Sequence, residues 1–321
     1  MKILVTGSAG FIGFHVAKYL LEQGDEVAGL DNFNPYYDVA LKEGRNKILQ
    51  EYSAFKCVRE DISDTSFMEK FFRDEQFDVV CHLAAQAGVR YSLDHPHTYV
   101  NANILGFLNI LEGCRHNNIR RLVYASSSSV YGGNTKLPFS ETDNVDTPVS
   151  LYAASKKSDE LMAHCYTHLY GIQTIGLRFF TVYGPWGRPD MAMWLFTEAI
   201  LNNKPIKVFN KGDMQRDFTY IDDIVQGVVA SIDKDGLDQY EVFNLGNNNS
   251  EDLMALIAII ENSLGREAEK ELLPMQPGDV KATYADIKQA KRKLGFEPKT
   301  KITEGVPEFI KWYREYFSVL K

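Results

Sequence analysis

Tyr152 and Lys156 stand at positions i and i+4, and together they could carry out proton transfer. This spacing places a phenol and an ammonium on one face of a helix. A phenol alone is a poor base at neutral pH, because its pKa is about 10. A fixed cation nearby favours the phenolate and brings the phenol pKa toward the working range of an enzyme. Ser127, in the serine run 126–129, ends an expected strand and completes the candidate catalytic group.

A glycine-rich segment near the start of the chain could bind a dinucleotide. Gly7, Gly10 and Gly13 follow a β-branched run and open an amphipathic stretch, with Phe11 and Ile12 between them. Glycines here allow a tight turn, close approach of backbone N–H groups to a pyrophosphate, and close packing of helix on strand. The spacing is G-x-x-G-x-x-G. By itself, the segment could equally serve only to pack the helix against the strand.

Asp31 favours the dinucleotide interpretation. It ends the second expected strand, where a carboxylate can accept hydrogen bonds from both hydroxyls of the adenosine ribose. The same charge would repel a 2′-phosphate, and no arginine follows directly, so the sequence favours NAD over NADP. Further predicted cofactor contacts follow the second, third and fourth expected strands: Asn32, Asp61, Ile62, Leu83, Ala84 and Ala85.

Elements that would position these residues alternate through the first half of the chain. The alternation predicts an α/β fold with a doubly wound, Rossmann-type parallel sheet. The predicted strands are Lys2–Thr6, Glu26–Leu30, Phe55–Val58, Val79–Leu83, Leu122–Ala125 and Thr174–Phe179. The predicted helices are Phe11–Gln23, Phe67–Asp74, Thr98–Asn117 and Leu151–Tyr170.

The alternation breaks after residue 180. Residues 1–180 are predicted to form the NAD-binding Rossmann domain, and residues 181–321 a smaller, mainly helical, substrate-binding lobe over the carboxyl edge of the sheet. A strand near 241–247 is expected to return to that sheet. The other expected elements are a helix at Met191–Leu201, strands at Ile206–Phe209 and Arg216–Tyr220, a helix from Ile221, and a mainly helical tail from Ser250.

Composition excludes several classes of protein. The 321 residues are 45% hydrophobic and 24% charged, which is typical of a globular enzyme. A net charge of −8 disfavours nucleic acid as a partner. The longest apolar run, Leu253–Ile260, is far shorter than the ~20 residues of a membrane span, and no signal peptide is expected. The cysteines lack zinc-binding spacing, so we expect no metal site and buried free thiols in a reducing cytoplasm; they are Cys57, Cys81, Cys114 and Cys165.

Taken together, the glycine turn, Asp31, the serine run and the Tyr152/Lys156 pair resemble the extended short-chain dehydrogenase/reductase family. The resemblance runs essentially from end to end. It is closest to nucleotide-sugar epimerases and, among these, to bacterial UDP-glucuronate 4-epimerases, which supply polysaccharide biosynthesis. The segments that carry it are 31–38 (DNFNPYYD), 87–92 (AGVRYS) and 178–191 (RFFTVYGPWGRPDM).

This resemblance implies a mechanism. Tyr152 would take the proton of the sugar 4-hydroxyl while a hydride passes from carbon 4 to the nicotinamide. Ser127 would hold that hydroxyl and relay the proton, and Lys156 would also bind the nicotinamide ribose. The bound 4-keto sugar would then turn over and take the hydride back on its other face, so NAD should stay tightly bound. Asn101 is a further cofactor contact that the resemblance implies.

The substrate would be an acidic UDP-sugar. Enzymes that act on UDP-glucose typically have asparagine where this chain has Thr181, and related 4,6-dehydratases have an acidic pair where it has Ser128 and Ser129. Hydroxyls at these places could donate to a carboxylate, which acidic side chains would repel. Arg188 could add positive charge, or could simply pair with Asp190.

Binding of the nucleotide is implied by further matches. Arg216 stands where relatives bind the diphosphate, in an R-D-F-T-Y segment, and Asp279 stands in a P-G-D segment near phosphate or ribose. Gln276 replaces the arginine that many relatives have before that segment. Asp279 could instead be a turn residue. Phe209 could be a core residue. The remaining predicted substrate contacts are Arg90, Val208 and Phe209.

Three alternatives stay open. The protein could epimerise UDP-glucose or UDP-N-acetylglucosamine, it could decarboxylate UDP-glucuronate, or it could be a catalytically silent dinucleotide sensor. Relatives pair two helices across a two-fold axis, so a homodimer is expected. The apolar residues of Thr98–Asn117 and Leu151–Tyr170 that could form this interface, or be core, are Leu105, Phe107, Leu111, Leu161, Met162, Tyr166 and Leu169.

Overall fold

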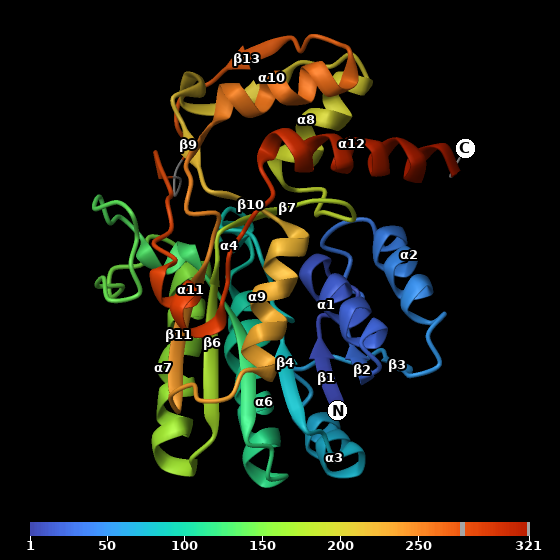
Figure 1. The fold of residues 1–321 in the computed structure, drawn as a ribbon, viewed down its shortest axis with the longest axis vertical. Helices are drawn as coiled ribbons and strands as arrows, with labels where there is room; N and C mark the ends of the chain where they lie inside the picture. The colour runs from blue at the N-terminus through green and yellow to red at the C-terminus, as the bar shows by residue number, and fades with distance from the viewer. Residues whose placement is uncertain (277–279, 320–321) are drawn as a thin grey trace.

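A seven-stranded parallel sheet forms the centre of the computed structural model, which describes residues 1–276 and 280–319. The strand order is β11-β6-β5-β4-β1-β2-β3 (Figure 1), which confirms the expected doubly wound sheet. The order reverses between β1 and β4, where such folds bind ligands at the carboxyl edge. The strands are β1 (Lys2–Thr6), β2 (Glu26–Leu30), β3 (Phe55–Val58), β4 (Val79–His82), β5 (Arg121–Ser127), β6 (Gln173–Phe179) and β11 (Tyr240–Leu245).

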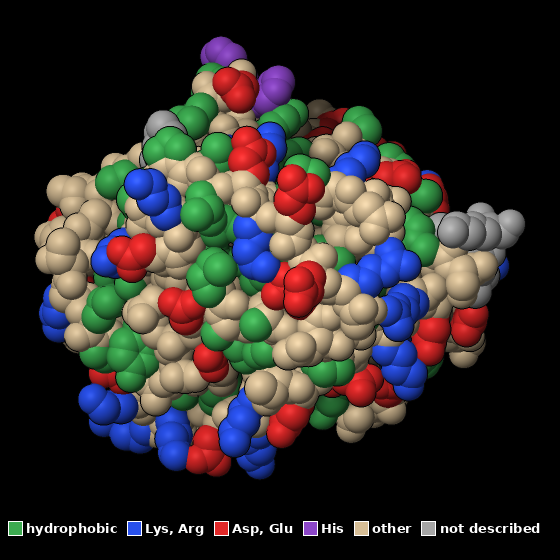
Figure 2. All heavy atoms as spheres, turned by 90° about the horizontal axis from the view of Figure 1, so that it is seen from above, with side chains coloured by type: hydrophobic (Ala, Val, Ile, Leu, Met, Phe, Trp, Pro, Cys, Tyr) green, Lys and Arg blue, Asp and Glu red, His purple; other side chains and the backbone are tan. Residues whose placement is uncertain are grey.

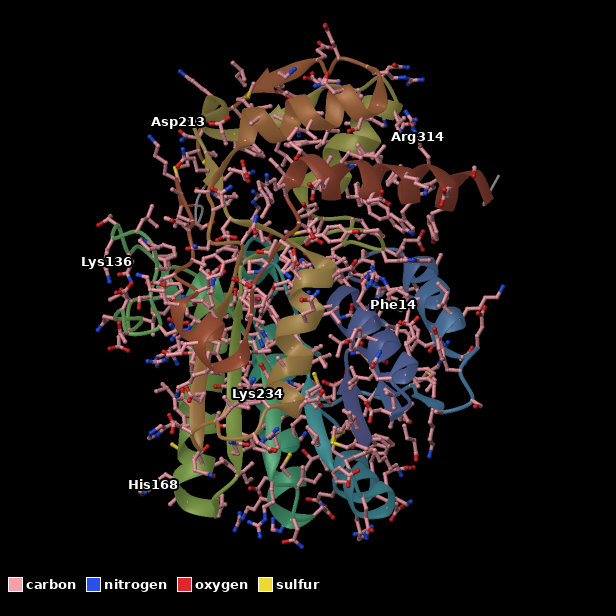
Figure 3. All side chains as sticks on the ribbon, viewed as in Figure 1. Phe14, Lys136, His168, Asp213, Lys234 and Arg314 are labelled. Atoms are coloured by element: carbon pink, nitrogen blue, oxygen red, sulfur yellow. The ribbon has the colours of Figure 1, made fainter. Side chains whose placement is uncertain are left out.

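Helices cover both faces of this sheet, because its strands are apolar on both sides. Ile3 and Val5 of β1 pack toward one layer, whereas Leu4 between them packs toward the other. Phe14, labelled in Figure 3, lies in the first layer. The first layer contains α1 (Phe11–Glu22), α9 (Ile221–Asp233) and α11 (Lys288–Leu294), and the second contains α3 (Thr65–Glu75), α6 (Gly106–His116) and α7 (Leu151–Tyr170).

A second lobe lies beyond the carboxyl edge of the sheet, at the top of Figure 1. Arg314, labelled in Figure 3, joins two of its helices by donating from Nη2 to the carbonyl of Leu264 at 3.0 Å. Figure 2 views this end and shows positive and negative side chains intermingled across it. The elements of the lobe are β7 (Thr181–Tyr183), α8 (Ala192–Leu201), β8 (Ile206–Val208), the 3₁₀ turn η3 (Phe209–Gly212), β9 (Gln215–Arg216), β10 (Phe218–Tyr220), β12 (Glu251–Asp252), α10 (Leu253–Leu264), β13 (Lys270–Leu272) and α12 (Ile302–Val319).

Several elements differ from the expectation. The helix expected at Thr98–Asn117 is divided into α5 (Pro96–Tyr99), the π-helix η1 (Val100–Leu105) and α6. The strand expected at Arg216–Tyr220 is interrupted at Asp217, whose side chain is buried. Several short elements and one longer helix were missed. The three-residue β7 is too short to show a pattern, and α2 (Val39–Leu49) buries Lys42, Arg45 and Asn46, so it has no continuous apolar stripe.

The expectation that all four cysteines are buried is only partly correct. Cys81 and Cys114 are buried as expected, but Cys57 is only partly buried and Cys165 is exposed. Cys165 lies in the second half of α7, where the outer side of the helix has no covering layer in the described chain. Among the helices of the described residues, none has both the length and the apolar character needed to cross a bilayer.

Candidate active site

A cleft of about 1150 Å³ lies between the carboxyl edge of the sheet and the second lobe. This volume exceeds that of a usual single-ligand pocket, so the cleft has room for a dinucleotide and a second nucleotide together. Its walls combine the glycine turn, the ends of β2, β4, β5 and β6, the start of α7, and residues of α8, β8, β9 and β10.

Most of the residues singled out from the sequence line this one cleft. Those on the sheet side are Gly7, Gly10, Phe11, Ile12, Gly13, Asp31, Asn32, Asp61, Ile62, Leu83, Ala84, Ala85, Tyr152 and Lys156. Those expected to contact the sugar nucleotide are Arg90, Ser127, Ser128, Ser129, Thr181, Arg188, Phe209 and Arg216.

Among the described residues, two predicted ones are not brought there. Asn101 is exposed on η1, and its neighbour Ala102 lines the cleft instead. Val208 is fully buried in the hydrophobic core, so its side chain is not a cleft residue. Asp279 lies outside the described residues.

The glycine turn leaves space for an anion at the start of α1. Gly7 has φ +72°, and the N–H of Gly10 donates to its carbonyl at 2.9 Å. A Cβ on Gly13 would lie 2.1 Å from the same carbonyl oxygen, and one on Gly7 would lie 2.8 Å from the N of Ala84. The first turn of α1 has no side-chain cap and no acidic residue. Its N–H groups therefore fit the pyrophosphate of a dinucleotide.

Asp31 is held at the end of β2 with one lone pair of each oxygen in use. Oδ2 accepts from the N–H of Ala9 at 3.1 Å, and Oδ1 accepts from the N–H of Phe33 at 2.8 Å. The remaining lone pairs fit the two hydroxyls of a ribose. Lys42, which the sequence analysis missed with the rest of α2, also lines the cleft and places its Nζ 3.8 Å from Oδ1.

Asp61 is fixed by three donors at the end of β3. Its Oδ1 accepts from the N–H and hydroxyl of Ser63, and its Oδ2 accepts from Nδ2 of Asn32 at 2.8 Å. Burial alone would raise the pKa of Asp61, but these hydrogen bonds hold it below its usual value. The carboxylate is therefore charged and rigid where the sequence analysis predicts a cofactor contact.

Lys156 joins the catalytic helix to the central strand. It is 1% exposed, and its Nζ donates to the carbonyl of Ala125 and to Oδ2 of Asp159, both at 3.0 Å. Since Ala125 lies on β5 two residues before Ser127, this contact brings the end of β5 to the helix turn that carries Tyr152. Burial raises the pKa of Asp159 to about 7, although the charge of Lys156 opposes that rise.

A buried asparagine positions the backbone of Tyr152. Asn103 donates from Nδ2 to the hydroxyl of Ser155 at 2.9 Å, and that hydroxyl donates to the carbonyl of Tyr152 at 2.8 Å. Asn103 also accepts from the N–H of Gln86, in the loop after β4. The sequence analysis missed Asn103. Its signal was a polar residue among apolar ones, two positions from the incorrectly chosen Asn101.

Hydrogen bonds fix the serine run at the end of β5. Ser127 Oγ accepts from the N–H of Ser129 at 3.1 Å and caps the 3₁₀ turn η2 (Ser128–Tyr131). Ser126 donates to Glu160 at 2.7 Å, and Glu160 pairs with Arg178 at 2.8 Å. This buried network leaves the next hydroxyls facing the cleft.

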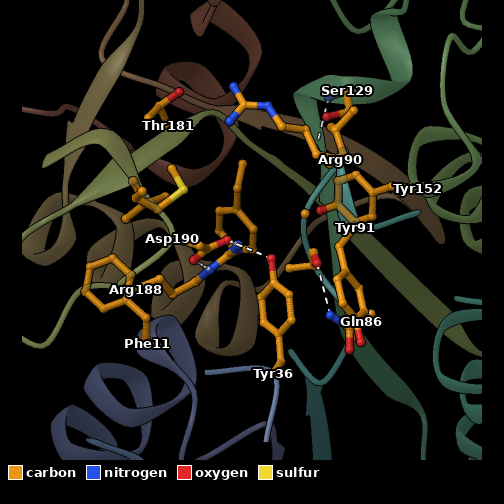
Figure 4. Close-up of a pocket in the computed structure, with 18 of the residues that line it drawn as sticks. Phe11, Tyr36, Gln86, Arg90, Tyr91, Ser129, Tyr152, Thr181, Arg188 and Asp190 are labelled. Carbon is orange, nitrogen blue, oxygen red and sulfur yellow. Dashed lines mark hydrogen bonds and ion pairs between the residues drawn. The ribbon is translucent and has the colours of Figure 1, made fainter. Parts of the chain in front are cut away.

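Arg188 lies across the cleft from Ser129, beside Asp190 and Tyr36 (Figure 4). Its guanidinium binds both oxygens of Asp190, at 3.0 and 2.5 Å, so the pairing considered from the sequence is present inside the cleft. Asp190 also accepts from the hydroxyl of Tyr36 at 3.0 Å. Burial would raise the pKa of Asp190, but Arg188 and Tyr36 hold it below its usual value. Sequence reasoning missed Tyr36 and Asp190 as cleft residues.

Asp217 joins the parts of the second lobe that surround the cleft. Its backbone carbonyl accepts from the N–H of Thr181 at 3.1 Å. Its carboxylate accepts from the N–H groups of Asn247 at 2.6 Å and Ala285 at 3.1 Å. Burial raises the pKa of this carboxyl to about 6. Its neighbour Arg216 donates to the carbonyl of Lys281 at 3.2 Å.

Comparisons with known proteins agree with this arrangement. The model of the GDP-mannose 4,6 dehydratase family matches residues 4–309. Protein CapI of Staphylococcus aureus is 53% identical over 99% of this chain and 100% of its own length. UDP-glucuronate 4-epimerase 4 of Arabidopsis thaliana is 50% identical over 99% of this chain and 76% of its own. The crystal structure of UDP-glucuronic acid 4-epimerase from Bacillus cereus, in complex with UDP-glucuronic acid and NAD, is 37% identical, with a TM-score of 0.93 over 98% of this chain and 100% of that one.

Proposed function

The chain belongs to the nucleotide-sugar branch of the extended short-chain dehydrogenase/reductase family, and we propose that it is an isomerase that interconverts UDP-glucuronate and UDP-galacturonate. Bound NAD supplies a reversible two-electron oxidation at carbon 4 of the sugar. The residues that would hold NAD are the glycine turn, Asp31, Asp61 and the loop 83–85. The sugar nucleotide would lie against residues 181–321, while α9, β11 and α11 of that half complete the sheet domain.

Proton transfer would be the task of three side chains. Tyr152 takes the proton of the 4-hydroxyl and returns it after the sugar has turned over. Ser127 holds the hydroxyl in line with the phenol. Lys156 keeps the helix turn of Tyr152 against β5 through the carbonyl of Ala125, and its ammonium provides a positive charge next to the developing phenolate.

The carboxylate of the sugar would be held by neutral donors and one arginine. Ser128, Ser129, Thr181 and Arg188 line the same cleft as Tyr152. A 4-keto-glucuronate is a β-keto acid, which loses carbon dioxide when its carboxylate stands perpendicular to the carbonyl plane. Donors that hold the carboxylate near that plane would prevent this loss. The absence of an acidic pair at 128 and 129 also argues against 4,6-dehydration.

The observation that supports the proposal is that these hydroxyls and Arg188 line the same cleft as Tyr152. The test is to incubate the purified protein with UDP-glucuronate, without added NAD, and to identify products by proton NMR. UDP-galacturonate is expected, with NAD carried by the protein, and Tyr152→Phe should abolish its formation. UDP-xylose or a 4-keto pentose would assign a decarboxylase instead. Turnover of UDP-glucose but not UDP-glucuronate, even with NAD supplied, would overturn the proposed substrate.

A homodimer is part of the proposal. Phe107 and Leu111 are buried in the core, so they are not available for an interface. Leu105 of η1 and Leu161 and Leu169 of α7 are exposed, by 37%, 56% and 63%. These apolar side chains support pairing of two copies through η1 and α7. Light scattering should give a mass twice that of the chain. The Leu161→Glu variant should give the mass of a single chain. The proposed compartment is the cytoplasm, where thiols such as that of Cys165 stay reduced.

A further inference from the structure

The loop between β7 and α8 brings Arg188 into the cleft, and side chains from the other half of the chain hold its backbone. Three consecutive carbonyl groups, those of residues 185–187, accept such hydrogen bonds. His15 of α1 donates from Nε2 to the carbonyl of Pro185 at 2.9 Å. Arg45 of α2 donates from Nη2 to the carbonyls of Trp186 at 2.5 Å and Gly187 at 3.3 Å.

The other nitrogen of the same guanidinium contacts the cofactor side. Arg45 Nη1 donates to the carbonyl of Ala9, inside the glycine turn, at 2.8 Å. It also donates to the hydroxyl of Tyr37 at 2.8 Å. One side chain therefore connects the segment expected to bind pyrophosphate with the loop that ends in Arg188.

Only an arginine fits these contacts. Arg45 is 0% exposed, and the hydrogen-bond acceptors found for it among the described residues are three carbonyls and a phenol, all neutral. Its Nε has no partner in that part of the chain. Burying a cation without a carboxylate is costly, so hydrophobic packing does not explain the residue. Its planar fork reaches acceptors in several directions, which the single nitrogen of lysine does not.

The backbone conformation of the loop also requires contacts that stabilise it. Trp186 has φ +60°, a conformation that side chains other than glycine rarely adopt, and one that costs energy unless surrounding contacts fix it. The Trp186 ring packs against Phe14, Trp312 and Tyr316 at centroid distances of 5.7, 5.2 and 5.1 Å. Arg45 and His15 fix the backbone on either side of this residue.

We propose that Arg45 is a positioning residue that ties the Arg188 loop to the cofactor turn, so that the place of the carboxylate-binding arginine is set by the dinucleotide site. His15 would hold the loop alone by hydrogen bonding, because its Nε2 donates to the carbonyl of Pro185, whereas toward the glycine segment its ring makes only an aromatic contact with Phe11. The inference rests on the proposed function for the part that concerns the sugar carboxylate. Its structural part concerns this chain's own backbone and can be measured without substrate.

The experiment compares Arg45→Met with the wild-type protein as purified, and with Lys47→Met, which removes an exposed cation from the same helix. Three quantities are measured: NAD released on denaturation, hydrogen exchange of the 184–190 peptide, and the KM for UDP-glucuronate beside the Ki for UDP. Arg45→Met should lose bound NAD, exchange faster in 184–190, and raise KM by about tenfold or more with little change in Ki, since UDP lacks the carboxylate. Lys47→Met should match the wild type in all three.

Two more variants separate the contact with the Arg188 loop from the contact with the glycine turn. His15→Phe should speed exchange of the loop and raise KM while keeping NAD, because it removes the hydrogen bond to Pro185 but keeps an aromatic ring against Phe11. Arg45→Lys keeps the charge but not the fork, and should change in the same direction as Arg45→Met, which provides a test if the methionine variant fails to fold. Wild-type NAD content and loop exchange in a folded Arg45 variant would overturn the inference. A wild-type protein inactive on UDP-glucuronate would overturn only the proposed substrate, since exchange and NAD content still report on Arg45.

Discussion

The ion pair behind the catalytic residues should make the stability of the protein depend on pH in a way that one substitution removes. Asp159 and Lys156 are each 1% exposed, and Lys156 Nζ lies 3.0 Å from Asp159 Oδ2. Burial raises the pKa of Asp159 from 3.8 to about 7. Between these values the folded protein holds a proton that the unfolded chain has lost. The stabilisation from this group is therefore complete at low pH and is lost as the pH rises toward 7.

The size of the effect follows from the two pKa values. At about 1.4 kcal/mol for each pH unit, the interval from 3.8 to about 7 corresponds to about 4 kcal/mol. Because the group is only half titrated at pH 7, about 2 kcal/mol of this is lost between pH 5 and 7. Asp159→Asn removes the titration while keeping the side-chain volume and a carbonyl oxygen that faces Lys156. The free energy of unfolding of the wild type, minus that of the variant, should therefore fall by about 2 kcal/mol from pH 5 to pH 7.

Urea unfolding of both proteins at a fixed, saturating NAD concentration measures this difference. Subtraction cancels the contributions of other groups, including the Asp217 carboxyl, whose pKa burial raises to about 6. Infrared spectra of protein labelled with carbon-13 at the aspartate carboxyls give a direct check. The wild type should show a carboxylic acid band that disappears near pH 7 and that Asp159→Asn lacks. Parallel stability curves, or an ionised Asp159 at pH 5, would refute this reasoning.

Three further substitutions test other parts of the structure. Gly13→Ala puts a Cβ 2.1 Å from the carbonyl oxygen of Gly7, so α1 must move by about 1 Å. We expect the variant to lose bound NAD and about 1–3 kcal/mol of its free energy of unfolding. Gly133→Ala, whose Cβ would meet only a side-chain atom at 4.0 Å, is the control, and NAD content with thermal unfolding measures both. Asp217→Asn turns an N–H donor toward backbone N–H groups and should cost about 1–3 kcal/mol; equal thermal stability would contradict the hydrogen-bond assignment. Thr181→Ala should increase the share of UDP-pentose among the NMR products, and an unchanged share would count against a role in holding the carboxylate.

The parallel sheet could be predicted because its strands are short and most of them are buried on both faces. Lys2–Thr6, Glu26–Leu30 and Phe55–Val58 have the predicted bounds, since turns or charged residues end each run sharply. Helix α2 escaped detection for a physical reason. Between two buried leucines, the side it turns inward carries Lys42, Arg45 and Asn46, so polar groups interrupt its apolar face. Hydrophobic periodicity cannot reveal such a helix.

The residues of the candidate site also divide into those that the sequence could locate and those that it could not. Gly7, Asp31, Tyr152 and Lys156 could be located because their spacing within one strand, turn or helix already places them together. Asp190 could not be placed in the cleft, because its partner Tyr36 lies in the loop after β2, in the other half of the chain, and a carboxylate two residues from an arginine is common in loops.

Contacts between residues far apart in the sequence, such as that of Tyr36 with Asp190, mean that both halves of the chain form the cleft. Strand β6 would be an open edge without β11, and α1 would lose its neighbour α9, although both partners come from beyond residue 220. In the other direction, the substrate loop depends on His15 and Arg45 for the conformation of Trp186. The boundary expected near residue 180 therefore does not separate two folding units. For the same reason, a substitution far from Arg188 in the sequence, at Arg45, is expected to act on the sugar carboxylate more directly than changes in nearer parts of the second lobe.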